Sequence, residues 1–258
     1  MTLQLPARAP KPRTVGRTMI IDKGVPLRHF IDIIESQGEH VDFVKFGWGT
    51  SVVTKNFGVK LDVLKEANID FYLGGTLFEK YIQQDRFEEF RSLCRGYGCR
   101  FVEVSNGTID ITNDEKAEYV SRLTDDFSVI SEVGSKSQAA SDVMAPARWI
   151  SYIKADLDAG ATLVTLETRE GGKGGICQSN GELRYDLIEK ILSATIDHES
   201  LLFEAPSTEL QTYFVKRVGP DANLGNISIT DIIPLETIRV GLRSETLLAF
   251  ESRFVEVA

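Results

Sequence analysis

Short apolar runs rich in β-branched and aromatic residues alternate along this chain with longer stretches in which apolar residues recur at helical spacing. The short runs predict buried strands and the longer stretches predict amphipathic helices. Eight strand-helix units follow one another, which is the pattern of an α/β protein with a single (β/α)8 barrel of the TIM type. The expected strands cover residues 18–22, 43–46, 70–73, 100–104, 128–133, 162–167, 201–204 and 223–228.

The helical stretches are predicted from the spacing of their apolar residues. Residues 78–97 are expected to form one long helix, because Tyr81, Phe87, Phe90 and Leu93 fall on one stripe. Residues 114–124 are expected to form a helix whose alternating charges lie on a solvated face. The glycine-rich segment 169–181 is interpreted as a lid over the site.

The length of 258 residues fits one barrel domain, residues 15–258, preceded by a proline-containing arm, residues 1–14, that is loosely ordered or packed on a neighbouring surface. The absence of a leader pattern and of a disulfide framework predicts a cytoplasmic protein, and no apolar run approaches the length of a membrane span. A net charge of -9 argues against nucleic acid as the main partner. Small molecules are the expected partners, and a homo-oligomer stays open.

Carboxylates stand at the predicted ends of five strands: Asp22, Glu103, Glu132, Glu167 and Glu204. In a barrel these ends converge on one mouth, where the active site forms. Carboxylates gathered in a partly dry pocket require a compensating cation. Lys23, Lys45, Lys136 and Arg169 are candidates, and magnesium bound through oxygen is another. Alternatively, some of these charges simply pair with one another at the barrel top.

Glycine-rich strand ends allow backbone amides to approach an anion. They occur at Gly74-Gly75-Thr76, at Gly171-Gly172-Lys173-Gly174-Gly175 and at Gly225-Asn226. In barrels the loops after the last two strands commonly bind phosphate, which favours Gly225 and Asn226 as phosphate contacts. Neither a Walker motif nor a dinucleotide fingerprint is present.

Several longer segments, spread in order over about residues 13 to 247, resemble the phosphosulfolactate synthase family. The most specific is Lys45-Phe46-Gly47-Trp48-Gly49-Thr50. The others include Asp22-Lys23-Gly24, Gly74-Gly75-Thr76-Leu77-Phe78-Glu79, Ser131-Glu132-Val133-Gly134, Phe203-Glu204-Ala205-Pro206, Asn223-Leu224-Gly225-Asn226 and Leu235-Glu236-Thr237-Ile238-Arg239.

The resemblance implies a magnesium-dependent lyase or synthase that adds sulfite to phosphoenolpyruvate and forms (2R)-phospho-3-sulfolactate, on the way to coenzyme M or sulfolactate. Lys136 aligns with the family lysine that is expected to act as general acid. On this hypothesis, magnesium or its waters contact Asp22, Glu132, Glu167 and Glu204. The anionic substrate groups contact Lys23, Lys45, Glu103, Arg169, Gly225 and Asn226.

The chain departs from the family pattern at two places. Ser135 stands where the family has the first lysine of a Gly-Lys-Lys segment, and Gly171 stands where it has a serine. Two alternatives therefore stay open: a relative without this activity that acts as a stress-associated or binding protein, and a barrel enzyme acting on another phosphorylated enol acid.

Overall fold

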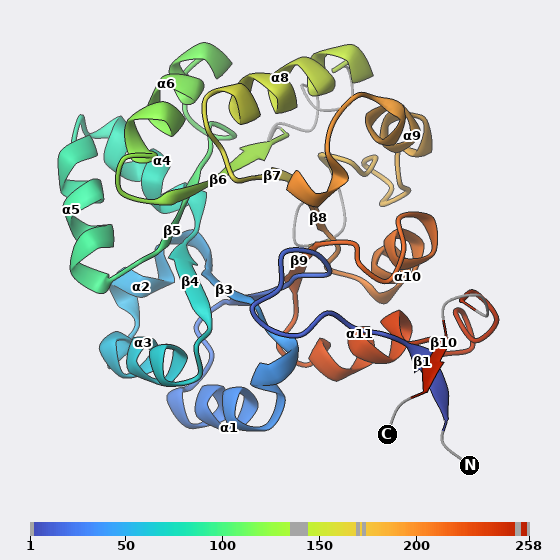
Figure 1. The fold of residues 1–258 in the computed structure, drawn as a ribbon. Helices are drawn as coiled ribbons and strands as arrows, with labels where there is room; N and C mark the ends of the chain where they lie inside the picture. Colours follow the sequence, from blue (N-terminus) through green and yellow to red (C-terminus); the bar gives the residue numbers. More distant parts are fainter. Residues whose placement is uncertain (1–2, 135–143, 169–170, 172–173, 251–253, 257–258) are drawn as a thin grey trace.

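The computed structural model describes residues 3–134, 144–168, 171, 174–250 and 254–256. Within them, eight parallel strands form a nearly closed ring surrounded by helices, which confirms the predicted (β/α)8 barrel (Figure 1). Every predicted strand agrees with the observed one to within one residue at each end. The barrel strands are β2 Thr18–Asp22, β3 Phe43–Phe46, β4 Asp70–Leu73, β5 Phe101–Val104, β6 Ser128–Val133, β7 Leu163–Leu166, β8 Leu201–Glu204 and β9 Leu224–Ile227.

The α-helices that the structure describes cover the outside of this ring (Figure 1). They are α1 Leu27–Gln37, α2 Thr50–Val53, α3 Phe57–Glu66, α4 Gly75–Gln83, α5 Phe87–Tyr97, α6 Asn113–Leu123, α8 Pro146–Asp158, α9 Tyr185–Ser193, α10 Thr208–Arg217 and α11 Ile232–Arg239. Three short 3-10 turns accompany them: η1 Gly38–His40, η2 Gly47–Gly49 and η3 His198–Ser200. In the described part of the chain, no helix is long and apolar enough to cross a bilayer.

The prediction of a single helix over residues 78–97 is wrong. The chain forms α4 and α5 instead, and Asp85 between them has a left-handed φ of 54°. The amides of Gln84 and Arg86 both donate to the carbonyl of Tyr81, which ends α4 in a tight turn. The apolar stripe continues across the turn, because Phe78 and Phe90 still pack edge to face with centroids 5.4 Å apart.

The strands follow the order β4-β3-β2-β9-β8-β7-β6-β5, so β4 and β5 form the two ends of the described sheet and share no ladder. A side chain bridges this seam. Glu103 on β5 accepts a hydrogen bond of 2.6 Å from the amide of Gly75, the first residue of α4. The carboxylate thus connects the two sides where strand pairing is missing.

Side chains that point into the barrel form two layers. The lower layer is apolar and consists of Met19, Phe43, Tyr72, Phe101, Ile130, Leu163 and Leu202. The upper layer contains Lys45, Glu103, Glu132 and Glu204. Each lies two residues further along its strand than a residue of the lower layer, because side chains alternate between the two faces of a strand. The polar layer therefore lies at the carboxyl ends of the strands.

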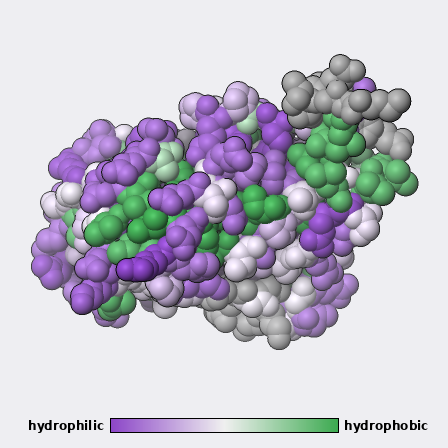
Figure 2. Space-filling view, turned by 90° about the horizontal axis from the view of Figure 1, so that it is seen from below, coloured by the Kyte–Doolittle hydropathy of each residue, from purple (hydrophilic) through white to green (hydrophobic). Residues whose placement is uncertain are grey.

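The N-terminal arm packs against the barrel through its basic side chains. Arg8 donates to Glu236 at 2.7 Å, Lys11 to the carbonyl of Val41 at 2.6 Å, and Arg13 lies 3.3 Å from Asp42. The arm also contains β1 Gln4–Pro6, which pairs antiparallel with β10 Phe254–Glu256 outside the ring (Figure 1). Figure 2 views the molecule from below, where apolar groups lie among hydrophilic ones both on the body of the barrel and at the end that projects from it.

Candidate active site

The ammonium group of Lys45 on β3 lies among three carboxylates at the mouth of the barrel. Its Nζ is 2.7 Å from Glu132, 3.0 Å from Glu103 and 3.4 Å from Glu204. All four side chains are buried. The structure therefore brings together residues from β3, β5, β6 and β8, which are far apart in the sequence.

Burial and crowding shift the pKa values of this cluster. Burial, together with the neighbouring Glu132 carboxylate, raises the pKa of Glu103 to about 7. Burial likewise raises the pKa of Glu204 to about 8, against the opposing effect of Lys45. Burial alone lowers the pKa of Lys45, but its three carboxylate partners outweigh this and hold that pKa well above its usual value. Lys45 therefore stays charged, while two of the carboxylates titrate near neutral pH.

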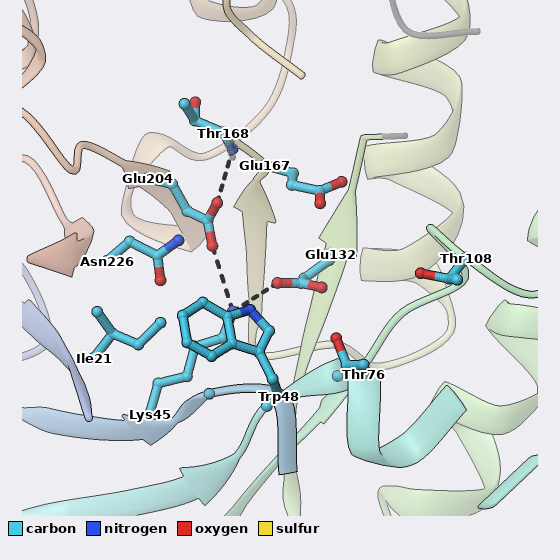
Figure 3. Close-up of a pocket in the computed structure, with 13 residues that line it drawn as sticks. Ile21, Lys45, Trp48, Thr76, Thr108, Glu132, Glu167, Thr168, Glu204 and Asn226 are labelled. Atoms are coloured by element: carbon cyan, nitrogen blue, oxygen red, sulfur yellow. Dashed lines mark hydrogen bonds and ion pairs between the residues drawn. The ribbon is translucent and has the colours of Figure 1, made fainter. Parts of the chain in front are cut away.

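A cavity of about 480 Å³ opens directly above the cluster. It is large enough for a small phosphorylated acid. Figure 3 shows Glu132 and Glu204 converging on Lys45, with Glu167 beside them and Trp48 in front. The cavity is lined by Ile21, Lys45, Gly47, Trp48, Gly74, Gly75, Thr76, Thr108, Glu132, Glu167, Thr168, Glu204 and Asn226.

The end of β7 is held in place by close backbone packing. The amide of Thr168 donates to Glu204 at 2.7 Å, and the amide of Ile176 donates to the carbonyl of Glu167 at 3.0 Å. A Cβ atom on Gly134 would lie 2.6 Å from the Glu167 side chain, so only glycine lets the end of β6 come this close. Glu167 is consequently fixed at the wall of the cavity.

Two residues other than glycine adopt left-handed backbone conformations beside the cavity. Trp48 has a φ of 49° and Asn226 a φ of 53°. Such a conformation is unusual for a bulky residue and often marks a functional site. The pairing of β2 with β9 shifts register at this point, a bulge that turns Asn226 toward the cavity. Its Oδ1 is buried and has no hydrogen-bond partner within the described part of the chain.

Five residues predicted for the site do line the cavity: Lys45, Glu132, Glu167, Glu204 and Asn226. Glu103 lies beneath them, fully buried at the seam. Gly225 faces the barrel interior, where a Cβ would come within 2.7 Å of Met19, and the exposed Lys23 is not among the lining residues. Two further predicted residues, Lys136 and Arg169, fall outside the described residues, as do Ser135 and part of the proposed lid.

Asp22 points away from the cavity. It pairs with Lys60 of α3 at 2.5 Å and accepts hydrogen bonds from the amides of Gly24 and Val25 at 2.7 and 2.8 Å. Its neighbour Ile21 lines the cavity, and side chains alternate along a strand, so Asp22 faces the helices. In this structure Asp22 organises the loop after β2, and its assignment as a metal ligand stays a prediction.

The structure also shows site features that the sequence pattern did not reveal. Thr108 and Thr168 line the cavity from loops whose sequences carry no distinctive motif. Lys116, expected on the solvated face of its helix, is instead fully buried. Its Nζ donates to Asp156 at 2.6 Å and to the main-chain carbonyl of Glu132 at 2.8 Å. An aspartate on α8 and a lysine on α6 thus hold the strand that carries Glu132.

The cavity has the donor chemistry that a hard divalent cation prefers, since Glu132, Glu167 and Glu204 offer carboxylate oxygens. The single Lys45 ammonium has three carboxylate neighbours, so when these are ionised the cluster carries more negative charge than Lys45 balances. Among the described residues, no group of three or more carboxylate, histidine or cysteine side chains is arranged so that it could hold a metal ion. Magnesium is usually bound through only one or two carboxylates, with substrate oxygens and water completing the shell, and the residues present fit that mode of binding.

Comparisons with known proteins identify the family. The model of the (2R)-phospho-3-sulfolactate synthase family matches residues 6–245. A phosphosulfolactate synthase of Bacillus subtilis is 47% identical over 245 residues, covering 95% of this chain and 97% of the relative. One from Methanothermobacter thermautotrophicus is 39% identical over 246 residues, covering 94% and 95%.

Solved structures resemble the chain in fold. The 3-hexulose-6-phosphate synthase of Salmonella typhimurium superimposes with a TM-score of 0.55 at 13% identity, covering 86% of this chain and 97% of that enzyme. At this identity the likeness supports the barrel architecture alone.

Proposed function

Because the chain belongs to the phosphosulfolactate synthase family and is an enzyme, we propose that it adds sulfite to phosphoenolpyruvate to form (2R)-phospho-3-sulfolactate. The observation that carries the proposal is the single Lys45 ammonium set among buried carboxylates beneath a cavity of about 480 Å³. Such a site can gather a cation and an anionic substrate above buried charges, where electrostatic stabilisation is stronger than in water.

In the proposed reaction, the sulfur lone pair of sulfite forms a bond to C3 of phosphoenolpyruvate. The electrons of the C2–C3 double bond move toward C2 and into the carboxylate, giving an aci-carboxylate. A proton delivered to C2 restores the carboxylate and completes the addition, so no redox partner is required. The enzyme accelerates this reaction by stabilising the negative charge that builds up on the carboxylate oxygens.

Glu132, Glu167 and Glu204 would hold magnesium, directly or through water. When bound, the metal would supply positive charge next to the substrate carboxylate and phosphate. Lys45 would orient the carboxylates around it and add a second positive charge, because its three ion pairs fix its ammonium group below the cavity. Asn226 would direct its amide at the substrate from the opposite wall.

Lys136 is proposed as the general acid that protonates C2, and Lys23 and Arg169 as further contacts for the anionic groups. Lys136 follows β6, the strand that carries Glu132 into the cavity. A lysine near other cations has a lowered pKa, which suits proton transfer close to neutral pH.

The proposal is tested by incubating the purified protein with phosphoenolpyruvate, sulfite and magnesium, with and without a chelator, and detecting phosphosulfolactate by mass spectrometry. We expect product that depends on all three additions. Binding of phosphoenolpyruvate without sulfite-dependent product would instead indicate another phosphorylated enol acid as substrate. A folded protein that binds neither phosphoenolpyruvate nor sulfite would indicate a relative that has lost the activity.

A further inference from the structure

The carboxylate of Glu79 on α4 binds the loop that follows β5. It accepts hydrogen bonds from the hydroxyl of Ser105 at 2.5 Å and from the amides of Gly107 and Thr108 at 3.0 and 3.1 Å. Glu79 is only 2% exposed. A buried carboxylate that accepts three hydrogen bonds from one short loop fixes the path of that loop.

The loop is also packed tightly against the beginning of α4. A Cβ atom on Gly75 would lie 2.4 Å from the hydroxyl oxygen of Ser105, so the glycine permits the contact. Residues 105–112 contain no helix or strand. Their position relative to α4 therefore depends on the hydrogen bonds to Glu79 and on this close packing.

The consequence appears at the cavity. Thr76 at the start of α4 and Thr108 in the loop both line it. Figure 3 shows the Thr108 hydroxyl directed toward the cavity from the same side as Thr76. The charged lining residues that the structure describes are three glutamates and Lys45. Neutral hydroxyl donors on this wall can bind anionic oxygens without the desolvation cost of another buried charge.

We propose that Thr108 is a substrate-binding residue for the anionic oxygens of the phosphorylated acid, and that Glu79 is the positioning residue that holds it there. This assignment rests on the function proposed above and specifies which wall of the cavity holds the anion. A hydrogen bond to a charged group contributes about 1.5–3 kcal/mol, which corresponds to roughly a 10- to 150-fold change in affinity.

The test compares steady-state kinetics of Thr108→Val and Glu79→Gln with the wild type. Thr108→Val keeps the side-chain shape and removes the donor, so we expect KM for phosphoenolpyruvate to rise on the order of 10-fold while kcat changes little. Glu79→Gln replaces an acceptor oxygen by a donor that faces the loop amides, so KM should rise similarly. Thr162→Val, exposed just before β7 at the opposite end of the barrel, and Glu118→Gln, exposed on α6, are the matched controls.

A double variant, Thr108→Val with Glu79→Gln, shows whether Glu79 acts by positioning Thr108 or by stabilising the protein in general. If Glu79 acts through Thr108, the KM of the double variant should be no higher than that of the worse single variant. Effects that multiply would overturn the positioning role. A KM for Thr108→Val equal to that of Thr162→Val would overturn the binding role.

Binding measured without turnover distinguishes this inference from the proposed function. Trp48 lines the cavity and is half exposed, whereas Trp149, the second tryptophan of the chain, is fully buried. Quenching of Trp48 emission therefore reports occupancy of the cavity by phosphoenolpyruvate. If the wild type binds this acid but forms no product, the proposed reaction fails, and weaker binding by Thr108→Val still supports Thr108. Absence of binding by the wild type would overturn both.

Discussion

Lys45 Nζ on β3 lies 2.7 Å from a carboxylate oxygen of Glu132 on β6, and this ion pair reaches across the seam between β4 and β5. The described sheet has no ladder at the seam, so the pair and the Glu103 contact to Gly75 connect its two sides. The Lys45–Glu132 ion pair therefore helps to close the barrel and also forms the floor of the cavity. Stability and activity should be coupled at Lys45.

Replacing Lys45 by Met should weaken both properties. Removing one partner of a buried charge cluster typically costs about 3–5 kcal/mol, because the remaining charges stay buried without compensation. Turnover should fall by at least about 100-fold, since the carboxylates lose their arrangement below the substrate. Chemical denaturation and the product assay measure the two effects, with the exposed Lys216→Met as control. Near wild-type activity in Lys45→Met would contradict this account of the site.

The stability of the protein should fall as pH rises from about 4.5 to about 8. The pKa values of Glu103 and Glu204 in the folded protein are about 7 and about 8, above the ordinary value of 4.5. The folded state therefore binds more protons than the unfolded state in this range, and the slope of unfolding free energy against pH is negative. These two groups favour folding fully below about pH 4.5, and that contribution is lost as pH rises through their folded pKa values.

Thermal unfolding followed by circular dichroism at a series of pH values, without divalent metal, measures this slope. In Glu204→Gln one of the two titrating groups is gone, so the melting temperature should depend less steeply on pH. Glu199→Gln, exposed in η3 at the opposite end of the barrel, should retain the wild-type slope. Equal slopes in all three proteins would show that Glu204 does not titrate as described.

Magnesium should stabilise the protein more at pH 8.5 than at pH 6. A cation bound by carboxylates competes with protons, so the raised pKa of Glu204 makes binding stronger at the higher pH. At a concentration 100 times the Kd, ligand binding stabilises the folded state by about 2.7 kcal/mol. The melting temperature with and without magnesium should therefore differ clearly at pH 8.5. A shift that is the same in Glu167→Gln, Glu204→Gln and Glu199→Gln would place the metal elsewhere.

Local pattern was sufficient to predict the barrel strands, because each is a short apolar run that ends at a polar or glycine-rich loop. The same pattern did not determine on which face a side chain lies. Asp22 and Ile21 are adjacent, and the alternation along β2 sends only Ile21 to the cavity. A carboxylate at the end of a strand is therefore a site candidate only once the register is known.

Features that depend on contacts between distant parts of the chain could not be predicted from the local sequence pattern. The pairing of β1 with β10 joins the two ends of the sequence. Lys116 has charged neighbours along its helix, which predicts exposure, yet its partner Asp156 is 40 positions away and buries it. Likewise, the loop that brings Thr108 to the cavity is bound by Glu79, which lies 29 positions earlier in the chain.

Lys116→Met should destabilise the fold by about 3–5 kcal/mol, because it leaves the Asp156 carboxylate buried without its cation. A Lys116→Met, Asp156→Leu double variant removes both charges and should recover much of the loss. Ser131→Ala removes one hydrogen bond to Asp156 and should cost only about 1 kcal/mol. Denaturant unfolding of the three variants measures this order. A double variant as unstable as Lys116→Met would mean that the lysine acts through its bond to the Glu132 carbonyl and not through charge compensation.

Lys136→Met should abolish turnover while leaving the fold intact, because it removes the proposed proton donor to C2 and leaves the residues of the Lys45 cluster unchanged. General acids typically contribute 100- to 10,000-fold to the rate, so kcat should fall by at least about 100-fold with little change in KM. The mass-spectrometric product assay and the melting temperature are measured together, with Lys154→Met, exposed on α8, as the matched loss of a lysine. Wild-type turnover in Lys136→Met would remove this residue from the mechanism. Lost turnover with an equally large rise in the KM for phosphoenolpyruvate would instead make Lys136 a binding residue, because a proton donor acts only once the substrate is bound.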